Sequence, residues 1–140
     1  MADPYLLTGA LVLGALAATA AAAGPAGPDV QRRAILDVSP AAPHSVSRIE
    51  ASTVSFGPGQ ASGRHMHPHP VVGVVAQGSF ILQVKGQAPL RLNPGDGFYE
   101  PADVTILRFD NASSVEPATM TAFYLVGDRS RPTIVMLPER

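Results

Sequence analysis

The sequence predicts an all-β fold, and within that class a barrel or a sandwich of two sheets. From Ser45 onward the chain divides into short segments rich in valine, isoleucine, phenylalanine, tyrosine and threonine, the residues that strands favour. Turn-forming glycine, proline, asparagine and aspartate separate these segments, and no segment after Arg33 keeps a helical apolar period over more than two turns. Many short strands with closely spaced turns are typical of barrels and sandwiches.

Eight segments are predicted as strands. Alternation is clearest in residues 80–85, where Phe80, Leu82 and Val84 share one face and the other face is mixed. One face of this strand is therefore expected to line the core. The predicted strands span residues 47–56, 71–76, 80–85, 90–92, 97–100, 104–109, 120–126 and 133–137.

A long apolar run precedes the predicted strands. Residues 6–23 carry no charge and end in small residues that suit a signal-peptidase site, and residues 24–28 read Gly-Pro-Ala-Gly-Pro, which is typical of a linker. We therefore expect residues 1–28 to be a signal peptide or membrane anchor with its linker, and residues 34–140 to be the barrel domain. Cleavage of the signal would leave the domain periplasmic or secreted.

Two alternatives to a cleaved signal stay open. The run of about 18 residues is close to the length of a membrane span, so residues 6–23 could anchor the protein in a membrane instead. No lysine or arginine precedes the run, although signal peptides normally begin with positive charge. The run could also be an alanine-rich helix packed on the domain, but a segment that is apolar on all sides would need burial on every face.

The composition excludes several kinds of function. The formal net charge is -1, Lys85 is the sole lysine, and no run of basic residues is longer than two, so no nucleic-acid partner is expected. The chain has no cysteine, which excludes disulfides, thiolate metal ligands and thiol nucleophiles. The sequence also lacks a nucleophile elbow, a phosphate-binding loop and a dinucleotide-binding fingerprint.

Three of the four histidines lie within five residues, in His65-Met66-His67-Pro68-His69. Alternate side chains of an extended segment point to the same side, so the three imidazoles could face one point. Neutral imidazoles are common ligands of zinc, iron, copper and nickel. The pattern therefore predicts a metal site. The alternative is a solvated loop, because prolines interrupt the segment.

Two stretches of the sequence resemble the two motifs of the cupin family. Residues 59–78, GQASGRHMHPHPVVGVVAQG, resemble the first motif, which has a glycine, two histidines separated by one residue, and a strand that ends in glycine. Residues 92–101, LNPGDGFYEP, resemble the second, in which a PGD turn leads into a strand that ends in proline. The resemblance covers roughly residues 45–126. It implies a cupin-type double-stranded β-helix, the jelly-roll barrel, with a metal near its open end.

The resemblance also implies ligands and partners. A cupin of this kind would bind a divalent transition metal (zinc, iron, manganese, nickel or copper) and a small organic molecule, and a homodimer is a frequent assembly. The family's metal ligands are two histidines and a glutamate from the first motif and a histidine from the second. His65 and His67 match the first pair, but the glutamate position falls at Val71 or Val72 and the later histidine at Ile106, and these side chains cannot bind a metal.

Two further residues are expected to complete the metal site. His69 lies on the same side as the histidine pair if the segment stays extended, and Glu100 shares a strand face with Phe98. The alternatives are that Pro70 bends His69 away from the metal and that Glu100 is an exposed carboxylate at a strand end. The second motif also departs from the family in having Asp103 where a glycine is usual.

Two hypotheses for function follow. In the first, the chain is a metal-dependent enzyme, a dioxygenase-like oxidoreductase or an isomerase, that acts on a small molecule in an apolar pocket lined by Val74, Leu82, Phe98 and Ile106. In the second, it is a non-catalytic ligand-binding or structural cupin with a degenerate metal site. The sequence singles out no catalytic side chain.

Overall fold

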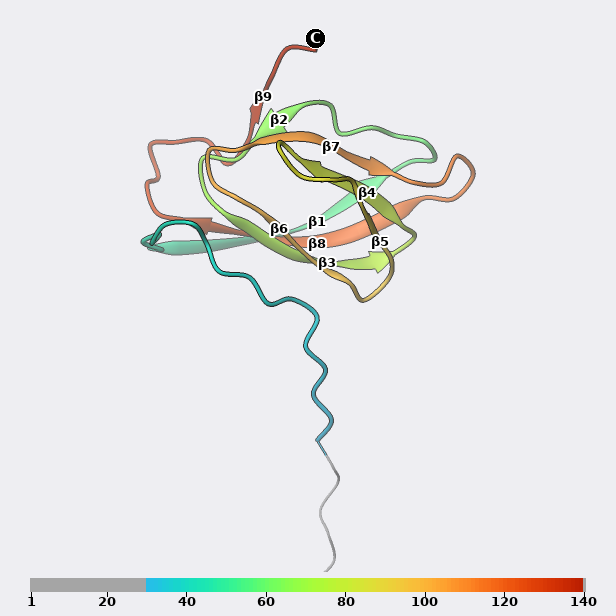
Figure 1. The fold of residues 1–140 in the computed structure, drawn as a ribbon, viewed down its shortest axis with the longest axis horizontal. Coiled ribbons are helices and arrows are strands. Elements are labelled where there is room, and N and C mark those ends of the chain that lie inside the picture. The colour runs from blue at the N-terminus through green and yellow to red at the C-terminus, as the bar shows by residue number, and fades with distance from the viewer. Residues whose placement is uncertain (1–29, 140) are drawn as a thin grey trace, which may run out of the picture. The chain divides into compact units, whose positions relative to one another are not determined.

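The computed structural model describes residues 30–139, so the predicted signal or anchor segment lies outside the described residues. Contacts divide the chain between Arg32 and Arg33, and all strands belong to the second unit. Residues 30–139 form nine strands and no helix, as Figure 1 shows, which confirms the all-β prediction. The strands are β1 (Arg48–Phe56), β2 (His65–Met66), β3 (Val71–Gln77), β4 (Phe80–Val84), β5 (Leu90–Leu92), β6 (Gly97–Glu100), β7 (Thr105–Asn111), β8 (Ala118–Val126) and β9 (Val135–Met136).

The strands form two antiparallel sheets that face each other (Figure 1). One sheet has four strands in the order β1-β8-β3-β6, and the other has five in the order β5-β4-β7-β2-β9. Neighbours such as β3 and β6 are separated in sequence by strands of the opposite sheet, so the chain crosses repeatedly between the layers. This crossing brings residues that are far apart in sequence onto the two inner faces.

Phenylalanine side chains from both sheets fill the space between them. Phe98 comes from the four-stranded sheet and contacts Phe109 of the five-stranded sheet edge to face, with ring centroids 4.9 Å apart. Phe80 makes similar contacts with Phe56 and Phe109. Such pairs add to the free energy gained from apolar burial. The predicted inner face of β4 is confirmed, because Phe80, Leu82 and Val84 are all buried.

Half of the predicted strand ends agree with the structure, and the other half differ from it by one or two residues. β7 continues to Asn111 and β8 begins at Ala118, because these residues pair with Phe80 and Phe56 on the neighbouring strands of their own sheets. Their side chains have little intrinsic preference for strands, so pairing rather than propensity decides the ends. β2 was not predicted as a strand, since two residues carry no alternation signal, and β9 is shorter than the predicted segment.

A tight turn sets the start of β6 and with it the position of Glu100. The Asp96 amide donates to the Asn93 carbonyl, and the Asp96 carboxylate accepts from the Asn93 amide at 2.8 Å. Gly95 has a φ of 88°, which glycine adopts without strain. The PGD sequence therefore has a structural role, because it forms the turn that connects β5 to β6.

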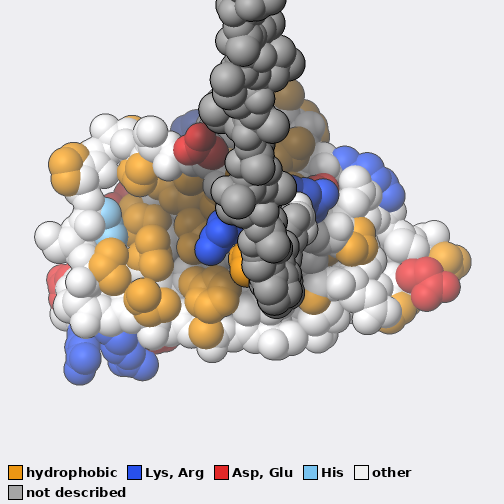
Figure 2. All heavy atoms as spheres, turned by 90° about the horizontal axis from the view of Figure 1, so that it is seen from below, with side chains coloured by type: hydrophobic (Ala, Val, Ile, Leu, Met, Phe, Trp, Pro, Cys, Tyr) orange, Lys and Arg blue, Asp and Glu red, His pale blue; other side chains and the backbone are white. Residues whose placement is uncertain are grey.

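The outer face of the four-stranded sheet carries exposed apolar side chains. Ile49 on β1 is 63% exposed and Phe123 on β8 is 36% exposed, and register places both on the face opposite Glu50 and Tyr124. Figure 2 views the molecule from below, on the side of this sheet, and shows hydrophobic side chains gathered there. Among residues 30–139 no helix is long and apolar enough to cross a membrane.

Candidate metal centre

Strand β2 directs two of the clustered histidines into the space between the sheets. β2 is hydrogen-bonded on both sides, with His65 opposite Ile106 of β7 and opposite Met136 of β9. His67 follows as an isolated bridge to Ala102. Because side chains alternate along an extended chain, His65 and His67 point to the same side. Both imidazoles are buried, at 4% and 3% exposure.

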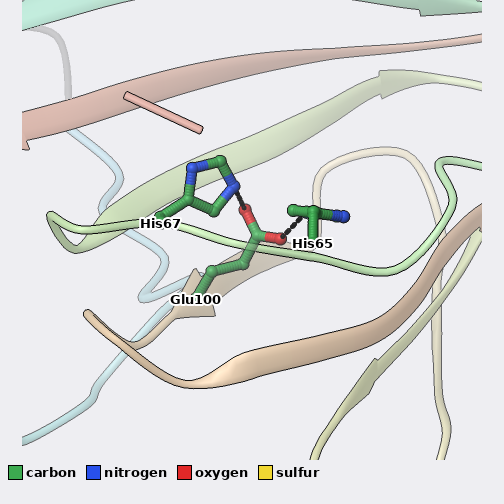
Figure 3. A group of neighbouring side chains, drawn as sticks. All are labelled: His65, His67 and Glu100. Atoms are coloured by element: carbon green, nitrogen blue, oxygen red, sulfur yellow. Dashed lines mark ion pairs between the residues drawn. The ribbon is translucent and has the colours of Figure 1, made fainter. Parts of the chain in front are cut away.

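Glu100 reaches the same point from the opposite sheet. It is the last residue of β6, it pairs with Val71, and its side chain is only 4% exposed. One carboxylate oxygen lies 3.4 Å from Nε2 of His65, and the other lies 3.5 Å from Nε2 of His67 (Figure 3). A ligand atom from each of the three side chains lies within 4.8 Å of the other two.

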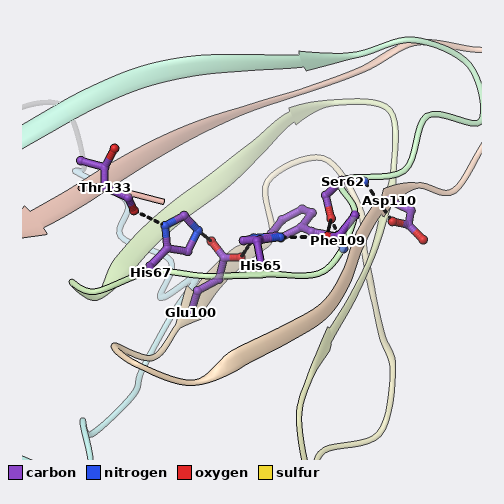
Figure 4. A network of polar contacts seen from close by, with 8 residues as sticks. Ser62, His65, His67, Glu100, Phe109, Asp110 and Thr133 are labelled. Carbon is purple, nitrogen blue, oxygen red and sulfur yellow. Dashed lines mark hydrogen bonds and ion pairs between the residues drawn. The ribbon is translucent and has the colours of Figure 1, made fainter. Parts of the chain in front are cut away.

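Backbone carbonyls fix the orientation of both imidazoles. Nδ1 of His65 lies 2.9 Å from the Gly63 carbonyl, and Nδ1 of His67 lies 2.6 Å from the Thr133 carbonyl (Figure 4). A carbonyl oxygen can only accept, so each Nδ1 carries the hydrogen. Both Nε2 atoms therefore face Glu100 and are free to bind a proton or a metal ion. This is the arrangement of a metal-binding histidine, whose second nitrogen donates to an oxygen.

Glu100 is not satisfied by the protein alone. Its Oε1 is buried and has no hydrogen-bond partner within residues 30–139. The two distances to imidazole nitrogens are longer than those of normal hydrogen bonds. A buried carboxylate without partners is unfavourable unless a cation is near it. A divalent ion among the three donor atoms would satisfy Glu100 and both Nε2 lone pairs, so the residues fit a metal.

The two histidines differ in their affinity for a proton. Burial is the largest influence on His65 and lowers its pKa, but the nearby Glu100 carboxylate and the Gly63 carbonyl together raise the pKa above 6.5. At His67 burial dominates, and its pKa falls below 6.5 despite the charge of Glu100 and the Thr133 carbonyl. Of the two imidazoles, His65 is therefore the one that more readily holds a proton.

A cavity of about 230 Å³ opens beside these three residues. Its wall is mainly apolar and includes Phe56, Met120 and Ile134. Besides the three candidate ligands, polar groups come from Ser55, Gln60, Ser62 and Tyr124. A space of this size with few polar groups suits a small organic molecule rather than a polymer.

Comparison with known proteins decides the family. Residues 52–124, more than half of the 140, match the family model described as the cupin domain. This chain belongs to the cupin family. The predicted resemblance is thereby confirmed, and the two facing sheets are the layers of a cupin barrel. No curated protein matches the chain.

Several solved cupin structures resemble this one in fold. An oxalate oxidase in complex with glycolate is 22% identical with a TM-score of 0.54, over 64% of this chain and 46% of that one. A DMSP lyase from Ruegeria pomeroyi is 22% identical with a TM-score of 0.54, over 63% and 42%. A sugar phosphate isomerase from Silicibacter pomeroyi is 27% identical with a TM-score of 0.50, over 58% and 52%. The matched part of this cupin thus spans about half the length of these proteins or less.

In this cupin the candidate carboxylate ligand lies on a different strand from the one that the family motif implies. The first-motif glutamate position falls at Val71, which is buried and cannot bind a metal. Glu100 is the cross-strand partner of Val71 on the neighbouring strand, and both side chains face inward. Since directly paired side chains lie about 5 Å apart, a carboxylate at position 100 can reach nearly the same point.

The structure does not bring His69 to the cluster. β2 ends at Met66 and the chain bends at Pro68 and His69, so the extended geometry assumed for a third ligand is lost. Nε2 of His69 lies 3.0 Å from the Asp128 carbonyl, and the Gly127 amide faces its Nδ1 at 3.5 Å. Both ring nitrogens therefore face the backbone after β8. The alternative, in which the prolines turn His69 away, describes this segment.

None of the four predicted pocket residues lines the cavity beside the candidate metal ligands of this cupin. Ile106 has no exposed surface and belongs to the core, and Val74 lies on the outer face of β3. Leu82 and Phe98 line a separate cavity of about 410 Å³ under residues 36–41. Composition marked these residues as apolar, but only the strand register shows which cavity each one faces.

Tyr124 is a cavity residue that the sequence did not single out. Its ring lies 5.7 Å from that of His67, and the residue lines the cavity. Burial, and next the charges of Glu100 and Glu50, raise its pKa above 10. The hydroxyl is therefore neutral and can donate a hydrogen bond into the cavity.

Proposed function

We propose that this cupin binds a divalent transition metal through His65, His67 and Glu100 and uses it to transform a small organic molecule in the adjacent cavity. The observation that carries this proposal is the buried Glu100 oxygen with no partner, opposite two imidazoles whose Nδ1 hydrogens are already engaged. Two histidines and one carboxylate suit divalent zinc, iron, manganese, nickel or copper. The donor set of three leaves positions open for a substrate.

The substrate class follows from the lining of the cavity. A bound ion would supply Lewis-acid or redox chemistry to an oxygen of the substrate. The Tyr124 hydroxyl is placed to donate a hydrogen bond to that molecule, and Phe56 and Met120 exclude water from it. We infer a small molecule with an oxygen donor at one end and an apolar remainder. Oxidation of the dioxygenase type and isomerisation both fit this description, and the named relatives include an oxalate oxidase and a sugar phosphate isomerase.

Replacing the carboxylate ligand tests the metal site directly. We expect Glu100→Gln to weaken Co²⁺ binding by about 100-fold or more, because even outer partners of metal ligands contribute 10- to 100-fold. Glu116→Gln is the matched control, since Glu116 is exposed and lies outside the cluster. Calorimetric titration of both variants and the wild type with Co²⁺ measures the effect, alongside metal analysis of the purified wild type. Equal affinities in the two variants, or only trace metal and no Co²⁺ binding in the wild type, would exclude the proposal.

Metal binding is expected to strengthen as pH rises from about 6 to about 8. The raised pKa of His65 keeps this ligand protonated over more of the range, so the metal must displace a proton there. The lowered pKa of His67 leaves that ligand neutral. Release of one proton gives up to about a tenfold gain in affinity per pH unit. Co²⁺ titrations at several pH values measure this slope, and a flat profile would contradict the assignment.

In the metal-free protein, the contribution of His65 to folding stability is expected to fall as pH rises, which is opposite to the trend in metal affinity. A pKa raised by folding adds stability that is complete below the unfolded value of 6.5 and is lost as pH rises through the folded value. Unfolding of metal-free protein by urea at each pH therefore measures the combined contribution of His65 and His67, whose lowered pKa acts in the opposite direction, without that of the ion.

A non-catalytic cupin is the second candidate function. Val71 and Ile106 occupy two family ligand positions with apolar side chains, which favours a barrel that has lost its metal and kept a ligand pocket. This candidate predicts weak binding of Co²⁺ by the wild type. A tightly bound metal in purified wild-type protein would exclude it.

We propose also that the protein is exported and forms a homodimer. Residues 6–23 support export through their apolar, signal-like composition. The exposed Ile49 and Phe123 support pairing through the outer face of the four-stranded sheet. The mass of the mature protein recovered from cell fractions tests export, since an uncleaved cytoplasmic chain would contradict it. Sedimentation at micromolar concentration tests the dimer, which a monomer alone would contradict.

A further inference from the structure

The chain that follows the matched family segment lies along the histidine motif. We call residues 127–138 the C-terminal strap. Near its end, β9 pairs with β2 and the Leu137 amide donates to the Arg64 carbonyl at 2.8 Å. At its start, the Asp128 carbonyl accepts from His69 at 3.0 Å. The strap is thus fixed at both ends to the segment that carries the metal ligands.

The middle of the strap forms part of the metal centre. The Thr133 carbonyl accepts the Nδ1 hydrogen of His67, and Ile134 lines the cavity (Figure 4). A hydrogen bond at Nδ1 fixes both the tautomer and the rotation of the ring. The position of Thr133 therefore decides the direction in which Nε2 of His67 points.

Arg131 connects the middle of the C-terminal strap to a backbone carbonyl and to a carboxylate next to it. Its guanidinium donates to the Pro68 carbonyl at 3.2 Å and pairs through both Nη atoms with the carboxylate of Asp103. The Asp103 amide donates to the His67 carbonyl at 2.8 Å. A fork-like pair of this kind adds geometric precision to the contact as well as energy. The pair thus joins the strap to the backbone carbonyls of His67 and of the next residue, Pro68.

Asp103 keeps a backbone conformation that glycine would adopt more easily. Its φ is 58°, the one positive φ of a non-glycine residue within residues 30–139. This left-handed conformation is strained for most side chains, and glycine adopts it freely. The ion pair with Arg131 is about half exposed, so it adds little to global stability. Aspartate tolerates this conformation less freely than glycine, so its presence here is explained if its carboxylate has a local role at Arg131.

We propose that Arg131 and Asp103 are positioning residues for the metal site, which act through the C-terminal strap to hold the Thr133 carbonyl against Nδ1 of His67. This inference rests on the proposed metal-binding function. It differs from that function in assigning the orientation of His67 to residues that touch neither the ion nor the cavity. The pair would set metal affinity without supplying a ligand.

Two single variants test the proposal in the full chain. Arg131→Gln removes the guanidinium charge that pairs with Asp103, and Asp103→Asn removes the carboxylate while keeping a side chain that tolerates positive φ. Arg129→Gln is the matched control, because Arg129 is an exposed strap residue two positions from Arg131. We expect both test variants to weaken Co²⁺ binding about 10- to 100-fold. The control is expected to leave the affinity unchanged, and Arg131→Lys to restore part of the loss.

Two further readouts separate positioning from stability. The urea midpoint of each apo variant is expected to match that of Arg129→Gln. The absorption bands of bound Co²⁺ are expected to change in shape, because the orientation of one ligand has changed. Wild-type affinity in both test variants would overturn the proposal, and so would a loss of affinity that follows the loss of urea stability with unchanged Co²⁺ bands.

The imidazole nitrogens of the metal-free protein give a test that does not depend on metal binding. In long-range proton–nitrogen spectra we expect the Nδ1–H signal of His67 in the wild type and in Arg129→Gln, and its broadening or loss in Arg131→Gln. If the wild type binds no Co²⁺, the proposed function fails and this spectrum alone decides the role of the strap. An unchanged His67 signal in Arg131→Gln would overturn that role.

Discussion

Gly73→Ala is expected to lower the free energy of unfolding by about 3 kcal/mol or more, an effect at the upper end of those measured for overpacked cores. Gly73 lies in β3, between β6 and β8, and faces Phe98. An added Cβ would lie 2.3 Å from the Phe98 ring and 2.4 Å from the Thr121 carbonyl. The carbonyl is part of the sheet ladder and cannot move away, and Phe98 is packed against Phe109. Urea unfolding of the metal-free protein measures the change.

Gly57→Ala is the control for this prediction. Neither glycine has a positive φ, so alanine brings no backbone strain at either site, but a Cβ on Gly57 would meet only the Gln60 side chain at 3.7 Å. We expect a change of less than about 1 kcal/mol there. Similar urea midpoints for the two variants would show that β6 can shift away from β3, and the close packing assigned to this part of the core would then be wrong.

The sequence predicts the sheets well because strand and turn signals are local. The ends of β5 and β6 agree with the predicted segments, since each is bounded by glycine, proline or aspartate that forms a turn. β2 could not be predicted in this way. Its two residues form a strand only because β7 and β9 lie on either side, and that pairing joins residues about 40 and 70 positions away.

The candidate site was predictable where it depends on the alternation of strands. His65 and His67 meet because they are two residues apart, and Glu100 was identified through the face it shares with Phe98. His69 fits the same rule in sequence, but the rule holds only for extended chain, and Pro68 and Pro70 end the extension. Pattern alone therefore identifies candidate ligands, and the backbone path determines which of them can meet.

The groups that orient the ligands carry almost no signal in the sequence. The acceptors of the Nδ1 hydrogens are carbonyls of Gly63 and Thr133, and any residue type supplies a carbonyl. Their roles depend on where the C-terminal strap lies, which long-range contacts decide. Tyr124 could be placed on a strand, but which wall of the barrel it faces follows from the register of β8 with β3. Asp103 is the exception, because an aspartate where the family has a glycine is a local departure that marks an unusual contact.

Ile106→His is expected to strengthen metal binding by at least about tenfold, which corresponds to about 1.4 kcal/mol. His65 and Ile106 are direct cross-strand partners, so a side chain at position 106 begins about 5 Å from that of the metal ligand and on the same face. The family resemblance implies a histidine at this position. An imidazole there would supply a fourth donor to an ion held by His65, His67 and Glu100. Titration with Co²⁺ measures the gain.

The same substitution should destabilise the protein when the metal is removed. Ile106 is fully buried, and an imidazole without a partner in the core costs about 1 to 3 kcal/mol. Leu82→His is the control, because Leu82 is also buried but lines a different cavity, so it brings the same penalty without a route to the ion. Addition of Co²⁺ is therefore expected to restore the urea midpoint of Ile106→His and to leave that of Leu82→His low. Equal responses of the two variants would mean that position 106 does not face the ion, and the donor set of three would then lie differently in the cavity.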